Sequence, residues 1–166
     1  LGYWNDPDKT AERYKLAPGQ PAGLPIPEMA VWSGDTVKMD DDGFLYFIGR
    51  RDEMIKTSGY RVSPTEVEEV IYATELVTEV AAVGVGHPVL GQAVVLVIYT
   101  FGKDESVSEK LVDECKRQLP AFMVPARIIV RDEALPRNPN GKIDRKKLAG
   151  ELAEIFEGSQ KLLKYR

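Results

Sequence analysis

Hydrophobic and polar positions follow two alternating spacings from residue 53 onward. Short apolar runs rich in β-branched residues are typical of buried strands, and three runs fit this pattern: 80–85, 93–99 and 126–131. Residues 54–62 have the composition of a single extended, half-buried strand. Between the strands, apolar residues recur at helical intervals. Strands that alternate with helices predict an α+β domain over residues 53–150, in which helices flank a small mixed β-sheet.

The predicted helices are placed by the residues at which they begin. A Ser or Thr at the N-cap with Glu three residues later has the spacing of a capping box. The N-cap candidates are Ser63 with Glu66, Ser106 with Glu109, and Asp144 without a partner. Pro120 is expected to end the second helix. Residues 151–166 are expected to extend the last helix or to fray.

Residues 1–30 differ, because prolines and glycines interrupt any long regular element. A short helix is expected after Asp6 or Asp8. Residues 31–50 predict a β-hairpin that turns at Asp41-Asp42-Gly43. Large apolar side chains such as Trp4 and Trp32 have few neighbouring elements to bury them. They indicate packing against a part of the protein outside this sequence.

Composition narrows the classes of function. The formal net charge of −4 leaves no general basic footprint for nucleic acid, although a local phosphate site is still possible. A single cysteine and a single histidine exclude an internal disulfide and a cysteine metal cluster, and disfavour zinc sites and His-based triads, so no metal site is predicted. No apolar run approaches the length of a membrane span. A cytoplasmic protein fits these features.

Several polar residues are interpreted as structural. His87 precedes a proline in a loop, and Cys115 lies on the apolar stripe of a predicted helix, where it behaves as a small core residue. Glu66, Glu68 and Glu69 are interpreted as the start of a helix and its solvated face.

Three stretches have residues suited to binding or catalysis. In Trp32-Ser33-Gly34-Asp35, the carboxylate could accept hydrogen bonds from a ribose diol or could simply hold a turn. Residues 49–61 are dense in charge and could bind phosphates, or could form a solvated linker. Residues 136–145 place Lys142 at the tip of a tight loop, where it suits a phosphate or carboxylate oxygen; a plain surface turn before a helix cap is the alternative.

The order of these stretches resembles the C-terminal portion of the adenylate-forming superfamily, which includes acyl-CoA ligases, luciferases and peptide-synthetase adenylation domains. The resemblance covers residues 1 to about 148. It rests on GYWNDPDKTAERY, WSGD, GRRDEMIKTSGYRVSPTEVE and LPRNPNGKIDR. The motif WSGD departs from the family's more frequent threonine-containing TGD. The segment IKTSGYRVSP is more similar to acyl-CoA ligases than to peptide synthetases.

The resemblance implies roles for the first set of residues. Asp35 would hold the ribose hydroxyls of ATP and AMP, and Arg50 would approach the ribose or phosphate. Asp52 would be the hinge about which the C-terminal domain rotates. Lys142 would bridge the acyl carboxylate and the α-phosphate during adenylation.

A second set would serve thioester formation after rotation. Lys56 would replace Lys142 in the active site, together with Ser58 and Gly59, and Gly59 would line the pantetheine tunnel. Tyr60 and Arg61 are added as cofactor-binding candidates of the same segment. The implied cofactors are ATP, AMP and CoA, with Mg²⁺ held through a larger N-terminal domain.

The resemblance also implies a domain organisation. Residues 1–49 would be the end of the large ATP- and acyl-binding domain, 50–52 the hinge and 53–150 the mobile lid. The family's phosphate loop, Mg²⁺-binding glutamate and acyl pocket precede these motifs, and no stretch of this sequence supplies them. The expected partners are therefore that N-terminal domain, a carboxylic acid and CoA. An adenylation domain that loads a carrier-protein thiol, and a stand-alone docking module, stay open as alternatives.

Overall fold

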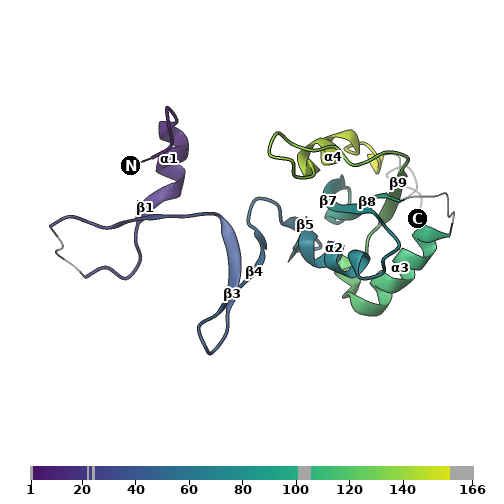
Figure 1. The fold of residues 1–166 in the computed structure, drawn as a ribbon, viewed down its shortest axis with the longest axis horizontal. Coiled ribbons are helices and arrows are strands. Elements are labelled where there is room, and N and C mark those ends of the chain that lie inside the picture. Colours follow the sequence, from purple (N-terminus) through teal and green to yellow (C-terminus); the bar gives the residue numbers. More distant parts are fainter. Residues whose placement is uncertain (1, 22, 24, 101–105, 158–166) are drawn as a thin grey trace. The chain divides into compact units, whose positions relative to one another are not determined.

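The computed structural model describes residues 2–21, 23, 25–100 and 106–157. The chain divides into two compact units, Leu1–Phe47 and Ile48–Arg166 (Figure 1). Each unit is described by itself below.

The first unit contains the predicted short helix and the predicted hairpin. Helix α1 (Pro7–Arg13) begins after Asp6, whose side chain accepts a hydrogen bond from the Lys9 amide at 2.9 Å. Strand β1 (Tyr14–Leu16) pairs with β2 (Met29–Val31) in antiparallel fashion. Strands β3 (Asp35–Met39) and β4 (Leu45–Arg50) form a second two-stranded sheet. As expected from the sequence, Trp4 is almost fully exposed at 97% and Trp32 is half exposed.

The second unit is built on a five-stranded sheet. Its longest pair is β7 (Glu79–His87) and β8 (Gly91–Tyr99), which run antiparallel over their full lengths. Strand β9 (Arg127–Arg131) pairs with β8 in parallel, so the sheet is mixed, as the sequence predicts. A hairpin of β5 (Ile55–Thr57) and β6 (Tyr60–Val62) joins β8 at its first residue, where Thr57 pairs with Gly91.

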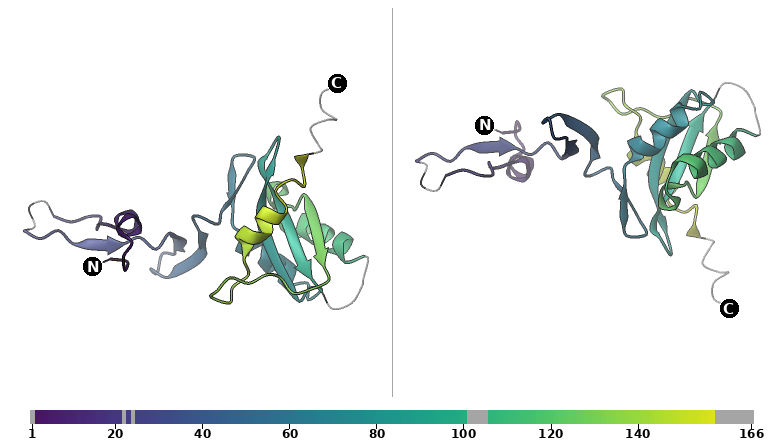
Figure 2. Two further views of the ribbon diagram at one scale, coloured as in Figure 1. Left: turned by 90° about the horizontal axis from the view of Figure 1, so that it is seen from above. Right: turned by 90° about the horizontal axis from the view of Figure 1, so that it is seen from below.

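Helices cover both faces of this sheet (Figures 1 and 2). Helices α2 (Pro64–Tyr72) and α3 (Val107–Gln118) pack on one face, and α4 (Arg145–Glu151) packs on the other. A 3₁₀ turn at Ala121–Met123 follows α3. Successive side chains of a strand point to opposite faces, so Val80 and Ala82 belong to one core and Ala81 and Val83 to the other. Burial on both faces explains why these strands are continuously apolar in the sequence.

The prediction of one extended strand over residues 54–62 is wrong. The chain folds back at Ser58 and Gly59, which both have positive φ, at 50° and 84°. Two successive residues with positive φ are the signature of the two-residue hairpin turn that suits the twist of paired strands. The signal was the Ser-Gly pair in the middle of the alternating segment.

The two predicted capping boxes are also wrong, although both helices begin where expected. Ser63 is the N-cap of α2, but its hydroxyl donates to the Ile48 carbonyl at 2.7 Å and makes no capping bond. Ser106 is the N-cap of α3 and makes no side-chain capping bond either. The predicted Asp144 cap is confirmed, because its carboxylate accepts from the Lys147 amide at 3.0 Å.

The residues after α4 return to the sheet. Phe156 is only 5% exposed and belongs to the core on the α4 face. The remainder of the tail for which extension or fraying is expected, residues 158–166, lies outside the described residues.

Candidate functional site

The segment expected to be a hinge is a charged turn at the end of β4. The Glu53 amide donates to the Arg50 carbonyl at 3.1 Å. Arg50 Nε donates to Asp52 Oδ1 at 3.1 Å and lies 4.0 Å from Glu53 Oε1. The other oxygen of Glu53 lies 3.3 Å from the guanidinium of Arg145 at the start of α4. The turn is thus tied electrostatically to the helix that follows the Lys142 loop.

Arg145 continues into the core through Glu68, which is not the solvated residue that the sequence predicts. The Glu68 side chain is 8% exposed, and Oε2 lies 2.7 Å from Arg145 Nη2. Glu68 Oε1 also accepts from the Ala82 amide of β7 at 2.8 Å. Burial lowers the pKa of the Arg145 guanidinium, but the hydrogen bonds and charge of Glu68, with the charge of Glu53, raise it, and the net shift is upward. One carboxylate therefore joins α2, β7 and α4.

We expect Glu68→Gln to lower the free energy of unfolding by about 2 kcal/mol, because it removes a charged acceptor and leaves Arg145 partly unpaired near the core. The matched control is Glu69→Gln, one residue along the same helix and exposed, which should change the free energy by less than about 0.5 kcal/mol. Urea unfolding followed by circular dichroism measures both. Equal changes in the free energy of unfolding would mean that Glu68 behaves as a solvated residue, as the sequence predicts.

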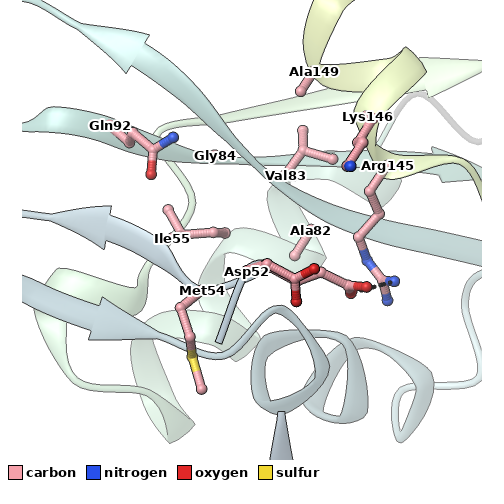
Figure 3. A pocket seen from close by; sticks show the side chains of 11 residues that line it. Asp52, Met54, Ile55, Ala82, Val83, Gly84, Gln92, Arg145, Lys146 and Ala149 are labelled. Carbon is pink, nitrogen blue, oxygen red and sulfur yellow. Dashed lines mark hydrogen bonds and ion pairs between the residues drawn. The ribbon is translucent and has the colours of Figure 1, made fainter. Parts of the chain in front are cut away.

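A cavity of about 250 Å³ opens beside this ion-pair network (Figure 3). Asp52 and Glu53 line it from the turn, Arg145 and Lys146 from α4, and Gln92 from β8. Of the predicted site residues, only Asp52 lines this cavity. The cavity therefore belongs to the hinge segment and not to either predicted catalytic lysine.

The β5–β6 hairpin carries the residues predicted for thioester formation. Lys56 and Arg61 are opposite each other in the register and both are exposed. Like charges directly opposite destabilise a strand pair, so an anion bound between them would stabilise the hairpin. At the tip, no atom lies within 4 Å of the position that a Cβ of Gly59 would take. The structure thus offers two cations and an unobstructed backbone in one place.

Contacts along this hairpin, including one at its tip, hold it in position. The Ser58 amide donates to the Leu90 carbonyl at 2.9 Å, and the Lys56 amide donates to Gln92 Oε1 at 2.7 Å. Tyr60 stacks on Phe122, with 4.1 Å between ring centroids and 9° between ring planes. The hairpin is therefore anchored on the β7–β8 turn and on the segment after α3.

The Lys142 loop is held mainly through its backbone. Asn138 Oδ1 accepts from the amides of Asn140 at 3.0 Å and Lys142 at 3.1 Å, and the Asn138 amide donates to the Lys142 carbonyl at 2.7 Å. Arg137 donates to the Gly141 carbonyl at 2.9 Å and forms an ion pair with Glu79. The loop therefore presents an exposed lysine on a preformed turn.

The two lysine-bearing segments lie at opposite ends of the sheet. Arg137 ties the Lys142 loop to Glu79, the first residue of β7. The hairpin with Lys56 is tied to Leu90 and Gly91, just beyond the last residue of the same strand. A nine-residue strand rises about 27 Å from end to end. Both views in Figure 2 show the yellow-green loop and the blue hairpin at opposite ends of this unit.

Asp35 belongs to the first unit, at the start of β3. Its amide donates to Ser33 Oγ at 3.2 Å. Arg13 donates to the Ser33 carbonyl at 2.7 Å and to the Trp32 carbonyl at 3.3 Å, so it holds the WSGD turn from α1. Sequence reasoning missed Arg13, Glu68 and Arg145, since no local pattern indicates bonds to residues so distant along the chain.

Three further findings concern the cysteine, metal binding and membrane spans. Cys115 is fully buried, and burial, with the nearby charge of Glu114, raises the pKa of its thiol to about 11. Within the described part of the chain, no cluster of three or more His, Cys, Asp and Glu side chains could hold a metal ion. A helix long and apolar enough to cross a membrane is likewise not found among the described residues.

The chain is similar in sequence and in structure to known proteins. Residues 66–142 match the family model described as the AMP-binding enzyme C-terminal domain. The chain is 40% identical over 154 residues to a long-chain-fatty-acid–CoA ligase of Escherichia coli O6:H1, covering 91% of this chain and 24% of that protein. It is 36% identical over 147 residues to tyrocidine synthase 1 of Brevibacillus parabrevis, covering 89% of this chain and 13% of that protein.

Among solved structures, ATP-bound MatB from Rhodopseudomonas palustris matches with a TM-score of 0.76 and 28% identity, covering 93% of this chain and 28% of that one. The chain thus spans about a quarter or less of the length of these relatives. The matched region includes most of α2, strands β7–β9 and the loop up to Lys142. Through its AMP-binding enzyme C-terminal domain, the chain belongs to the adenylate-forming superfamily.

Proposed function

We propose that this chain is the C-terminal part of an ATP-dependent acyl-CoA ligase. In the first half-reaction, a carboxylate attacks the α-phosphate of ATP to give acyl-AMP and pyrophosphate. In the second, the thiol of CoA attacks the acyl-AMP carbonyl to give acyl-CoA and AMP. The observation that supports this best is the placement of two lysine-bearing segments at opposite ends of one small sheet.

Lys142 would serve adenylation. The approach of a carboxylate to a phosphate crowds negative charge, and a fixed cation at that point stabilises the transition state. The Asn138 bonds preform the loop, so little ordering is needed when it reaches the substrates. Asp35 would hold the ribose of ATP, and Mg²⁺ would be bound by the N-terminal domain.

The β5–β6 hairpin would serve thioester formation. Lys56 and Arg61 supply two neighbouring cations for phosphate groups, and Ser58 and Tyr60 flank the same tip. The open space at Gly59 suits the passage of a narrow pantetheine arm. These features are the ones that distinguish a thiol-accepting half-reaction from adenylation alone.

A rotation at the hinge would exchange the end of the sheet that faces the active site, from the Lys142 loop to the β5–β6 hairpin. Segments at the two ends of a strand that rises about 27 Å cannot occupy the same active site in one orientation. Residues 50–52 would absorb the rotation, because a few dihedral angles at an element end suffice for a large domain movement. In this proposal residues 1–49 belong to the large domain, 53–150 form the mobile lid and 151–166 are its tail. The location would be cytoplasmic, where ATP and CoA are available.

The acceptor thiol is tested directly in the complete enzyme. We expect acyl-AMP formed from a fatty acid and ATP to be converted when CoA is added, with release of AMP. Conversion by a phosphopantetheinylated carrier protein but not by CoA would assign the alternative, which the similarity to tyrocidine synthase 1 supports. Absence of any acyl-AMP with a broad panel of carboxylic acids would contradict the ligase proposal itself.

We expect the 166-residue chain alone to form no acyl-adenylate, because its sequence contains no phosphate loop or acyl pocket of the family. ATP–pyrophosphate exchange with a broad panel of carboxylic acids measures this. The complete enzyme under the same conditions is the positive control. Exchange by the chain alone above the no-enzyme background would contradict the division of labour between the two domains.

A further inference from the structure

His87 occupies the end of β7, where the strand turns toward β8. It pairs with Gly91 across a three-residue turn, and Gly91 has a φ of 79°. The Nδ1 atom of His87 lies 3.2 Å from the Val89 amide and 3.3 Å from the Leu90 amide, and it accepts from both. An imidazole nitrogen that accepts hydrogen bonds carries no proton. The bonds therefore require a neutral ring with its proton on Nε2.

This turn is also the support of the β5–β6 hairpin. The Leu90 carbonyl accepts from the Ser58 amide at 2.9 Å, and Gly91 pairs with Thr57. The Lys56 carbonyl lies 3.4 Å from the position that a Cβ of Gly91 would take, so the two backbones approach closely. The peptide group whose carbonyl holds Ser58 directly follows the amides that His87 binds.

The His87 ring is itself fixed from the other side. Phe156 meets it edge to face, with 4.9 Å between ring centroids and 65° between ring planes. Phe156 is 5% exposed, and the Arg127 guanidinium lies 5.3 Å from the centroid of its ring. The imidazole is therefore positioned by packing as well as by its own hydrogen bonds.

We propose that His87 is a positioning residue for the thioester half-reaction: it shapes the Pro88–Leu90 turn through Nδ1, and the turn holds the Ser58–Gly59 tip in place. The first part of the proposal concerns structure alone, and the second rests on the proposed function of the hairpin. His87 touches no substrate in this scheme. Its effect passes through Leu90 to Ser58, at the end of the sheet away from Lys142.

Two substitutions of His87 test whether the turn needs an acceptor at the position of Nδ1 or only a polar side chain. In His87→Asn the side-chain oxygen takes the place of Nδ1, and the residue can bond to its own backbone two residues on. In His87→Gln the oxygen lies farther from the backbone, near the place of Nε2. Asn should therefore rescue the turn, and Gln should not.

The structural part is tested on this chain by NMR. Because His87 is the chain's only histidine, its imidazole ¹⁵N signals need no assignment, and they should show the neutral Nε2–H tautomer. The Ser58 amide should exchange with solvent roughly tenfold faster in His87→Gln, as expected for the loss of about one net hydrogen bond. It should exchange at the parent rate in His87→Asn, and the Lys142 amide should not change in either variant. The Nδ1–H tautomer, or equal Ser58 exchange in all three proteins, would overturn the proposal.

The functional part is tested in the complete ligase. His87→Gln should slow CoA transfer from supplied acyl-AMP roughly tenfold and leave ATP–pyrophosphate exchange at the parent rate, and His87→Asn should restore transfer. Equal losses in both half-reactions, with normal folding, would overturn the positioning role. If the ligase transfers to no thiol but Ser58 exchange responds as expected, the proposed function fails and the turn assignment stands.

Discussion

Replacing Lys142 by Ala in the complete enzyme should lower the rate of adenylation by on the order of 10²-fold or more and leave thioester formation from supplied acyl-AMP nearly unchanged. Loss of one cation aimed at developing charge typically has an effect of this size. The bonds to Asn138 come from the backbone of Lys142. An alanine keeps those bonds, so the loop should retain its shape and only the charge should be lost.

The measurement compares ATP–pyrophosphate exchange with CoA transfer. Lys147→Ala is the matched control, since Lys147 is an exposed lysine on α4 that supplies only its backbone amide to the Asp144 cap. This variant should have parent rates in both half-reactions. If Lys142→Ala slows the two half-reactions equally, Lys142 has only a structural role and the surface-turn interpretation holds.

The second large effect is expected at Gly59, with the opposite pattern. Gly59→Leu should keep pyrophosphate exchange and lower CoA transfer by on the order of 10²-fold, because a bulky side chain would obstruct the thiol and misplace it. The φ of 84° means that any residue with a Cβ is strained here. The space around the tip is open, since a Cβ at this position would have no atom within 4 Å apart from its chain neighbours.

Gly59→Ala separates backbone strain from bulk. Alanine and leucine share the cost of a positive φ and differ only in the size of the side chain. The two variants should therefore have similar circular dichroism and unfolding, while only leucine should block transfer. A pair of variants that lose transfer equally would assign the effect to the backbone conformation. A leucine variant that folds normally and transfers at the parent rate would remove the tunnel from the proposal.

Together the two substitutions examine whether one small domain serves two reactions from two ends. In the proposal, the parts that differ between the reactions are short segments; the sheet between these segments is buried on both faces. A rigid, well-packed sheet can carry both segments without bending. The charged turn at 50–53 is then the place where a movement would concentrate, and the Glu53–Arg145 contact links this turn to the helix that follows Lys142.

Features that depend on neighbours along the chain could be predicted from the sequence. The apolar runs of β7 and β8, the Asp144 cap and the hairpin of β3 and β4 were predicted because strand composition, capping and turn chemistry act within a few residues. The motifs around Lys142 and Gly59 were recognisable for the same reason. Their residue types and spacing are local.

Which distant groups meet depends on the three-dimensional fold. Glu68 has the sequence context of a solvated helix face, yet its side chain is buried and accepts hydrogen bonds from Arg145, 77 residues later. Ser63 has the spacing of a capping box, yet its hydroxyl donates a hydrogen bond to the Ile48 carbonyl. A buried polar group takes whichever partner the fold brings within reach, because an unpaired one is costly. The separation of Lys56 from Lys142 has the same origin, since it is set by the length of β7 and by the strand order of the sheet.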